Sequence, residues 1–343
     1  MFGLIIHSLE RFFWRRETRR RAHPFAWGID VLGGDTQRDD PRAFLQRYAQ
    51  QALDTSEQFF AAGAAAWYRL ENGVLSFPSA LESPFPENNV VCARWFPART
   101  DGPSAKRGGR AAVVVLPQWN AEWDGHANIC RFLNRLGLSA LRLSLPYHDR
   151  RKPAGFERAD YMVSPNIGLT LQASCQAVLD VRRALRWLEQ QGFTRLGILG
   201  TSIGSSVAFV TLAHEPALRA GVFLHVSTYV GDVVRTGLTT SHVWESLEGH
   251  VTAEELRHFW APISPFPFVP RLRDAGKQML LVSGRYDLSF LPEFSRRLWQ
   301  TMSAQAVPHK LLLLPCGHYT LARPPFSYWA GLRFGLFLRR ALA

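Results

Sequence analysis

Short apolar runs alternate with helical stretches from residue 111 onward, and this alternation restricts the possible folds more than any other feature. Residues 111–116 read AAVVVL, a continuous apolar run typical of a strand buried on both faces. Similar runs predict five further strands, at residues 139–145, 195–199, 220–226, 278–283 and 310–314. Strands that alternate with helices form a mostly parallel sheet joined by right-handed crossovers. We therefore expect an α/β protein with helices on both sides of its sheet.

Two segments lie outside this alternation. Residues 1–84 are predicted as an N-terminal helical extension that packs on or near the core, and residues 85–343 as the domain that holds the sheet. The segment of about residues 228–272 is too long for a simple crossover, so we expect a helical cap over one end of the sheet. Residues 100–110, TDGPSAKRGGR, are expected to form a polar loop.

A G-x-S-x-G motif at residues 200–204, GTSIG, separates the strand predicted at 195–199 from a predicted helix. A sharp strand-to-helix turn of this kind exposes the serine side chain at the carboxyl end of a sheet, and the two glycines let the crossing segments approach. The next backbone N–H, that of Ile203, would lie at a helix N-terminus and could stabilise an oxyanion. The motif and its context predict that Ser202 is a nucleophile.

A serine nucleophile needs an adjacent base, and two suitable residues follow later strands. Asp287 comes after the fifth predicted strand and His318 after the sixth, so both fall where ligands bind in an open α/β sheet. The order Ser, Asp, His along the chain is typical of one class of catalytic triad. We expect His318 to transfer the proton and Asp287 to orient its imidazole ring. Asp232, shortly after the fourth predicted strand, is the alternative acid.

The loop after the first predicted strand, Pro117-Gln118-Trp119-Asn120, is expected to supply a second oxyanion donor. Because proline has no N–H, the backbone N–H of either Gln118 or Trp119 would serve, and both stay open. The substrate pocket is expected to include Trp123, Tyr147 and His148. For His148, a polar loop that merely closes a strand end is the alternative.

The first 22 residues combine an apolar helix face with positive charge. Apolar residues at i, i+3, i+4 and i+7 spacing are followed by arginines, and the segment holds six arginines and two glutamates. It is too short and too charged to span a bilayer, and it lacks the order of a secretory signal. Its apolar face either docks on the protein's own body or lies in a membrane interface as a peripheral contact.

Charge and cysteine content narrow the remaining function classes. The net charge is +12, but no basic motif interleaved with aromatic residues appears, so nucleic-acid binding is not expected. The four cysteines lie far apart with no metal-ligand spacing, so we expect reduced cysteines, no metal and no cofactor. With no signal segment, these features predict a cytoplasmic protein, with a peripheral position at the membrane as the alternative.

Over residues 85–343 the motif order, strand placement and loop chemistry resemble the α/β-hydrolase superfamily. Residues 145–151, LPYHDRR, and the turn at 200–206 look most like a little-characterised bacterial branch of esterase-like hydrolases. The resemblance implies a serine hydrolase that acts on an ester, thioester or amide bond without a cofactor. The loop at 117–120 departs from the His-Gly-Gly pattern of many lipases.

We therefore expect hydrolysis of a small-molecule carboxylic ester or thioester through an acyl-enzyme on Ser202. Three alternatives remain open from the sequence: a peptidase or amidase with the same triad, a membrane-associated lipid acyl hydrolase, and a non-catalytic binding protein with the same fold.

Overall fold

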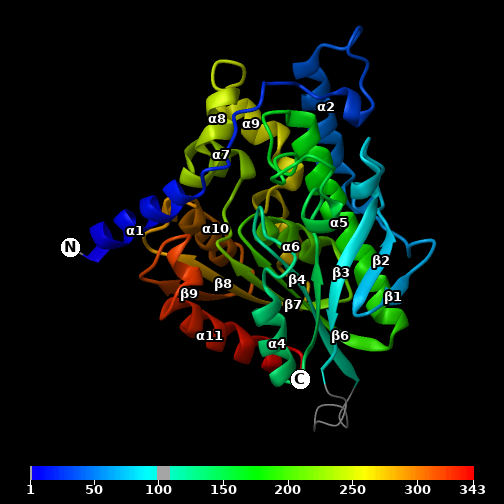
Figure 1. The fold of residues 1–343 in the computed structure, drawn as a ribbon, viewed down its shortest axis with the longest axis vertical. Coiled ribbons are helices and arrows are strands. Elements are labelled where there is room, and N and C mark those ends of the chain that lie inside the picture. The colour runs from blue at the N-terminus through cyan, green and yellow to red at the C-terminus, as the bar shows by residue number, and fades with distance from the viewer. Residues whose placement is uncertain (1, 99–108) are drawn as a thin grey trace.

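The computed structural model describes residues 2–98 and 109–343, which form a nine-stranded sheet in the order β1-β2-β3-β5-β4-β6-β7-β8-β9 (Figure 1). Most of the predicted polar loop, residues 100–108, lies outside the described residues. The strands are β1 Arg69–Glu71, β2 Val74–Pro78, β3 Val90–Phe96, β4 Arg110–Leu116, β5 Ser139–Leu143, β6 Phe193–Thr201, β7 Leu218–Leu224, β8 Gln278–Gly284 and β9 Lys310–Leu314.

The sheet is antiparallel at one edge and parallel elsewhere. β1, β2 and β3 pair antiparallel, and β3 pairs antiparallel with β5. From β5 through β4, β6, β7 and β8 to β9, every neighbouring pair is parallel. The central strand β4 is buried at every residue but its first, because helices cover both faces. The predicted α/β architecture with a mostly parallel sheet is thus confirmed.

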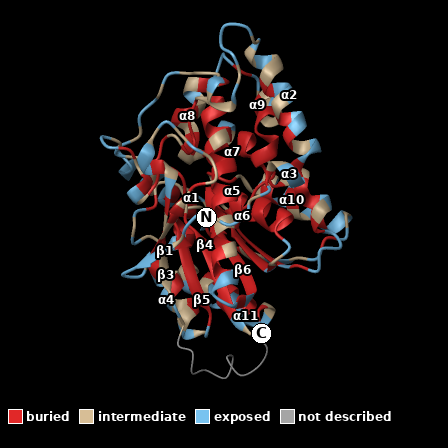
Figure 2. Ribbon diagram, turned by 90° about the vertical axis from the view of Figure 1, so that its right-hand side faces the viewer, coloured by how far each residue is buried: buried red, intermediate tan, exposed pale blue. Residues whose placement is uncertain are grey.

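Helices cover the sheet on both faces. One face carries α4 (Ala127–Arg135) and α11 (Phe326–Ala341), whose apolar residues join those of the sheet in one hydrophobic cluster. The other face carries α5 (Ile167–Gln190), α6 (Ile203–His214) and α10 (Pro292–Ala304), which share a larger cluster with the cap. Buried residues therefore run through the sheet and the helices next to it, with exposed ones on the outer surfaces (Figure 2).

Short helices occupy the segment predicted as a cap. They are α7 (Val230–Thr236), α8 (Ser241–Leu247) and α9 (Ala253–Phe259), followed by 3-10 turns at Ala261–Ile263 and Phe266–Leu272. A capping box of Thr252 and Glu255 fixes the start of α9. Residues of α7 line a cavity with Ser202, so the cap covers the carboxyl end of the parallel strands.

The N-terminal segment packs on both the cap and the sheet. After α1 (Phe2–Arg16), the helix α2 (Pro41–Asp54) begins at Asp40, whose side chain accepts a hydrogen bond from the Ala43 N–H, and the short α3 (Ser56–Phe59) follows. Arg42 of α2 donates to Glu255 of the cap at 3.0 Å. The boundary predicted at residue 84 falls between β2 and β3, which are paired strands of one sheet. The segment is therefore not helical throughout.

Candidate active site

Ser202 lies on a strained turn between β6 and α6. Its φ of 56° and ψ of −124° are unusual for a residue with a side chain, and its N–H donates to the Leu224 carbonyl at 2.8 Å. A Cβ on Gly200 would stand 2.1 Å from the Gly204 carbonyl oxygen, and one on Gly204 would stand 2.5 Å from that of Pro117. Both positions therefore require glycine, which explains the motif sterically.

The structure brings Ser202, His318 and Asp287 together. His318 Nε2 lies 3.1 Å from Ser202 Oγ, and His318 Nδ1 lies 3.2 Å from Asp287 Oδ2. The other carboxylate oxygen of Asp287 accepts hydrogen bonds from the N–H groups of Ser289 and Phe290 at 2.7 and 2.8 Å. These distances match those of a nucleophile, a base and an orienting acid.

Charge in this site is set by burial and by the Asp287 carboxylate. Burial alone would lower the pKa of His318, but the adjacent Asp287 outweighs it and raises that pKa above its ordinary value. Burial would also raise the pKa of Asp287, but His318 and His225 outweigh it and hold the pKa far below its usual range. Asp287 is therefore ionised, and His318 is a stronger base than free histidine.

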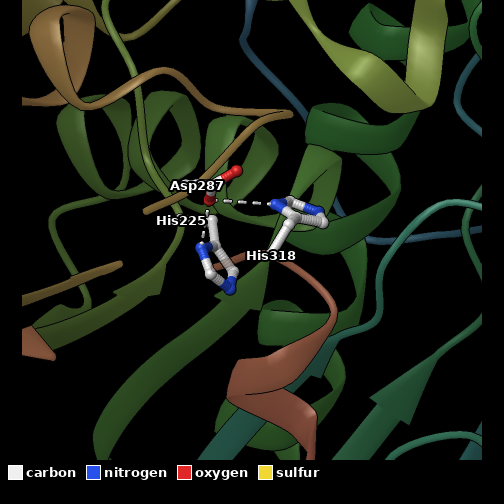
Figure 3. A group of neighbouring side chains, drawn as sticks. All are labelled: His225, Asp287 and His318. Carbon is white, nitrogen blue, oxygen red and sulfur yellow. Dashed lines mark hydrogen bonds and ion pairs between the residues drawn. The ribbon is translucent and has the colours of Figure 1, made fainter. Parts of the chain in front are cut away.

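A second histidine, which the sequence analysis did not identify, contacts the same carboxylate. His225 Nδ1 lies 2.8 Å from Asp287 Oδ2, and the two histidine rings are 4.3 Å apart between centroids. Figure 3 shows His225 and His318 on either side of the shared Asp287 carboxylate oxygen. Burial, followed by the charge of His318, lowers the pKa of His225, so this ring stays neutral at neutral pH. His225 directly follows β7, which ends at Leu224, whereas the predicted strand ran on to residue 226.

His225, Asp287 and His318 each have a side-chain atom of a kind that can bind a metal ion. The ligand atoms of His225, Asp287 and His318 lie within 4.8 Å of one another. The His318 contact with Ser202 and the two histidine contacts with Asp287 link these residues in one chain of polar contacts.

The loop that carries His318 is held by a residue from the other end of the chain. Glu10 of α1 is fully buried, and its carboxylate accepts hydrogen bonds from the N–H groups of Tyr319 and Thr320 and from the Thr320 hydroxyl, at 3.0, 2.9 and 2.9 Å. The Thr320 hydroxyl oxygen in turn accepts from the Gly317 N–H at 2.7 Å. A Cβ on Gly317 would stand 2.4 Å from Glu10 Cδ, so this glycine makes room for the carboxylate.

The same helix contacts the loop of Asp287. The ring of Tyr286 lies 6.0 Å from that of Phe2 and 5.9 Å from that of His7 between centroids. The sequence left open whether α1 docks on the protein's own body or lies in a membrane interface. The structure shows that its inner face docks on the protein. Among the described residues, no helix is long and apolar enough to cross a membrane.

Backbone donors for an oxyanion are present beside Ser202. Ile203 is the first residue of α6, so the helix itself does not use its N–H. In the 117–120 loop, the Asn120 N–H donates to His148 Nε2 at 3.0 Å. The N–H groups of Gln118 and Trp119 have no acceptor within the described part of the chain, and Trp119 lines the same cavity as Ser202.

A small cavity of about 30 Å³ adjoins Ser202. Its lining carries no charged side chain among the described residues and consists mostly of apolar groups: Trp119, Val163, Ser202, Ile203, Ser206, Ser227, Tyr229, Val230, Val233, Val234, Thr239, Thr240 and Phe290. A volume of about 10–15 Å³ is needed for one water molecule, so this space admits only a small group without movement of the walls.

Four residues proposed from the sequence lie elsewhere. Tyr147 is buried and packs against the rings of Phe85 and Tyr161. His148 is also buried, and burial lowers its pKa to about 4, consistent with its role as an acceptor for the Asn120 N–H. Trp123 lines a separate surface groove of about 460 Å³ beside β1, β2 and β3. Asp232 contacts Arg257 at 2.8 Å and does not reach His318. The structure thus places none of them at the Ser202 cavity.

A nucleophile turn at the carboxyl end of a mostly parallel sheet, with a histidine and an aspartate after later strands, defines the class of α/β-hydrolases. Comparison with known proteins agrees: the family match and the fold of the solved structures together indicate the α/β-hydrolase superfamily. The model of the prolyl oligopeptidase family matches residues 170–324, which include Ser202, Asp287 and His318. No curated protein matches the sequence.

Solved structures resemble this chain in fold at low sequence identity. An acetyl xylan esterase from Paenibacillus sp. R4 superposes with a TM-score of 0.62 at 14% identity, covering 86% of this chain and 98% of its own. An esterase from Pyrococcus furiosus gives 0.54 at 16% identity, covering 82% and 97%. An acylaminoacyl peptidase from Pyrococcus horikoshii gives 0.58 at 13% identity, covering 80% and 42%. The family match and this fold together support a hydrolase of the serine type.

Proposed function

We propose that the protein hydrolyses carboxylic esters through an acyl-enzyme on Ser202. The observation that carries the proposal is the hydrogen-bonded chain from Ser202 Oγ through His318 to Asp287. His318 takes the hydroxyl proton as Ser202 attacks the ester carbon, and it gives this proton to the leaving oxygen when the C–O bond breaks. A water molecule, deprotonated by the same histidine, then attacks the acyl group and releases the carboxylic acid.

The oxyanion of each tetrahedral intermediate would accept hydrogen bonds from two backbone N–H groups. One is that of Ile203 at the start of α6, and the other comes from Gln118 or Trp119. Trp119 is favoured because its residue lines the cavity next to Ser202, whereas Gln118 does not. Its indole N–H donates to the Ala159 carbonyl at 2.8 Å, which fixes the orientation of this loop.

The cavity beside Ser202 favours a short, uncharged acyl group. A charged acyl group would lose its hydration there without gaining a partner of opposite charge, because the described lining residues carry none. We therefore expect acetyl esters to be cleaved faster than esters of long acyl chains. The leaving group is not restricted by this argument, since it departs from the other side of the carbonyl.

A peptidase or amidase reaction is the second candidate, and the match to the prolyl oligopeptidase family favours it. The same triad would cleave an amide by protonating the leaving nitrogen. Parallel assays of an aryl acetate and the matching acetanilide discriminate the two. Faster hydrolysis of the ester by several orders of magnitude supports the esterase, and comparable kcat/KM values support the amidase.

The nucleophile can be tested by labelling with a fluorophosphonate, followed by intact-mass analysis. The wild-type chain should gain one label, and Ser202→Ala should gain none. Ser206→Ala is the matched control, because Ser206 is also buried and lines the same cavity. Labelling that persists in Ser202→Ala, or that disappears only in Ser206→Ala, would overturn the assignment of Ser202.

A further inference from the structure

Helix α1 has a second face that its docking leaves uncovered. Ile6 and Glu10 are buried on the inner face, but Phe2, Ile5, Leu9 and Phe12 are 49, 53, 38 and 50% exposed. Their spacing of three and four residues places these four side chains in one row, which we call the outer strip. Single exposed apolar residues are common, but a continuous row of large ones on one helix indicates a binding surface.

Positive charge surrounds the outer strip. Arg11, Arg15 and Arg16 lie exposed on the same helix, and exposed Arg19 follows it, whereas Arg21 is paired with Glu157 at 3.8 Å. The first 22 residues contain two acidic residues, and neither offsets this charge on the outer surface. Glu10 is buried on the inner face, and Glu17 is paired with Arg20 at 3.0 Å. The solvent side of α1 is therefore both apolar and cationic.

We propose that the outer strip of α1 binds the surface of an anionic lipid bilayer. An amphipathic helix in a membrane interface places apolar side chains at the boundary of the acyl chains, while arginines reach the lipid phosphates. A second copy of this chain is a poorer occupant, because two α1 helices in contact would bring their arginines together without acidic partners. The charge of the helix thus selects the anionic surface.

This surface lies next to the catalytic loops. The inner face of α1 binds the loop of His318 through Glu10 and contacts Tyr286 beside Asp287 through His7. Phe2, at the edge of the outer strip, also touches Tyr286. A bilayer on the outer strip would therefore stand one helix diameter, about 10 Å, from these loops. The inference does not rest on ester hydrolysis, because binding to the lipid surface can be measured without any substrate.

Co-sedimentation of the full-length chain with vesicles tests the proposal. We expect the wild-type protein to bind mixed phosphatidylcholine and phosphatidylglycerol vesicles, to bind phosphatidylcholine alone weakly, and to dissociate as salt is raised. The double variant Ile5→Ser/Leu9→Ser should bind anionic vesicles at least about tenfold more weakly, since it loses two large apolar side chains from the strip.

Matched controls distinguish binding through the outer strip from non-specific adsorption to vesicles and from loss of folding. Trp67→Ser and Leu70→Ser each remove an exposed apolar side chain beside β1, which lies on the opposite side of the molecule from α1 (Figure 1), and should bind like wild type. The strip variant should hydrolyse a soluble aryl acetate within about twofold of wild type. No wild-type binding to anionic vesicles, or equal binding by the strip variant, would overturn the proposal. If the wild-type protein forms a dimer and does not bind vesicles, and the strip variant is monomeric, the outer strip instead binds a second copy of this chain.

Discussion

The two sides of the proposed proton-transfer chain are held in place by different means. Ser202 is fixed by its own neighbours, since β6, α6 and the flanking glycines determine the turn. The His318 loop instead depends on Glu10, which lies more than 300 positions earlier in the chain. The Ser202 turn is therefore determined by nearby sequence, whereas the position of the proposed base depends on a helix from a distant part of the sequence. The two sides should respond differently to substitution.

The largest effect should come from the acid that both histidines share. We expect Asp287→Asn to lower kcat by about 10⁴-fold, because an amide no longer selects the required tautomer of His318 or stabilises its charged form. Asp232→Asn is the matched control, and it should keep kcat within about tenfold while lowering the free energy of unfolding by about 1–3 kcal/mol through its contact with Arg257. The reverse ranking of the two kcat values would assign the acid to Asp232.

Two glycine substitutions compare the two sides directly. A Cβ at Gly204 meets the backbone carbonyl oxygens of Pro117 and Leu116 at 2.5 and 2.7 Å, which cannot move without disturbing β4. Gly204→Ala should therefore lower both activity, by about 10³-fold, and the free energy of unfolding, by about 3 kcal/mol. A Cβ at Gly317 meets the Glu10 carboxylate at the end of a flexible side chain. Gly317→Ala should stay folded and lose about 10²-fold in kcat.

Substitution of Glu10 should have a somewhat smaller effect on kcat, because it disturbs only the loop that carries His318. In Glu10→Ala, the N–H groups of Tyr319 and Thr320 lose their acceptor, and we expect kcat to fall by about 10–100-fold while KM changes little. Glu71→Ala, an exposed glutamate on β1, should leave both constants unchanged. Adding Gly317→Ala to Glu10→Ala should cost little more. Additive losses in this double-mutant cycle would contradict the steric link between the two residues.

The smallest predicted effect is a shift in pH dependence. His318 acts as a base only when neutral, and Asp287 raises its pKa, so kcat/KM should fall as the pH drops through a value above 6.5. His225→Phe removes one of the two histidine partners that stabilise the Asp287 carboxylate. The carboxylate should then hold the proton of His318 more tightly, and the acid limb of the pH–rate profile should move to higher pH. An unchanged or lower acid limb would mean that His225 does not tune this pair.

The Ser202 turn, which depends on nearby residues, could be predicted from sequence. The contacts of His225 and Glu10, which depend on distant residues, could not. Ser202 was identified because a turn between a strand and a helix leaves a short, regular pattern. His225 was overlooked because an apolar run does not mark where its strand ends, and a shift of two residues placed this histidine inside β7. Glu10 was overlooked because its partners are more than 300 positions away, and no periodicity in a helix reveals such a contact.

The placement of other pocket residues failed for a related reason. Trp123 follows the same loop as Trp119, so nearness in sequence indicated a shared pocket, but the chain turns and Trp123 lies in a groove with Arg94 and Arg150. His148 has the polarity expected of a substrate contact, yet its ring nitrogens bond backbone groups of Asn120 and Pro146. Composition identifies a polar residue, but only the tertiary structure decides which partner satisfies it.

The Glu10 contact also has a consequence for how the protein is made. During synthesis α1 emerges before the sheet, whereas the residues that contact its Glu10 carboxylate follow β9, more than 300 positions later. Helix α1 therefore stays undocked, with both its faces exposed, until strands β1 to β9 have been made and the sheet has formed. Contacts that close so long a stretch of chain are slow to form. We expect enzymatic activity to appear later during refolding than the helical circular-dichroism signal, because the His318 loop is fixed only when it meets α1.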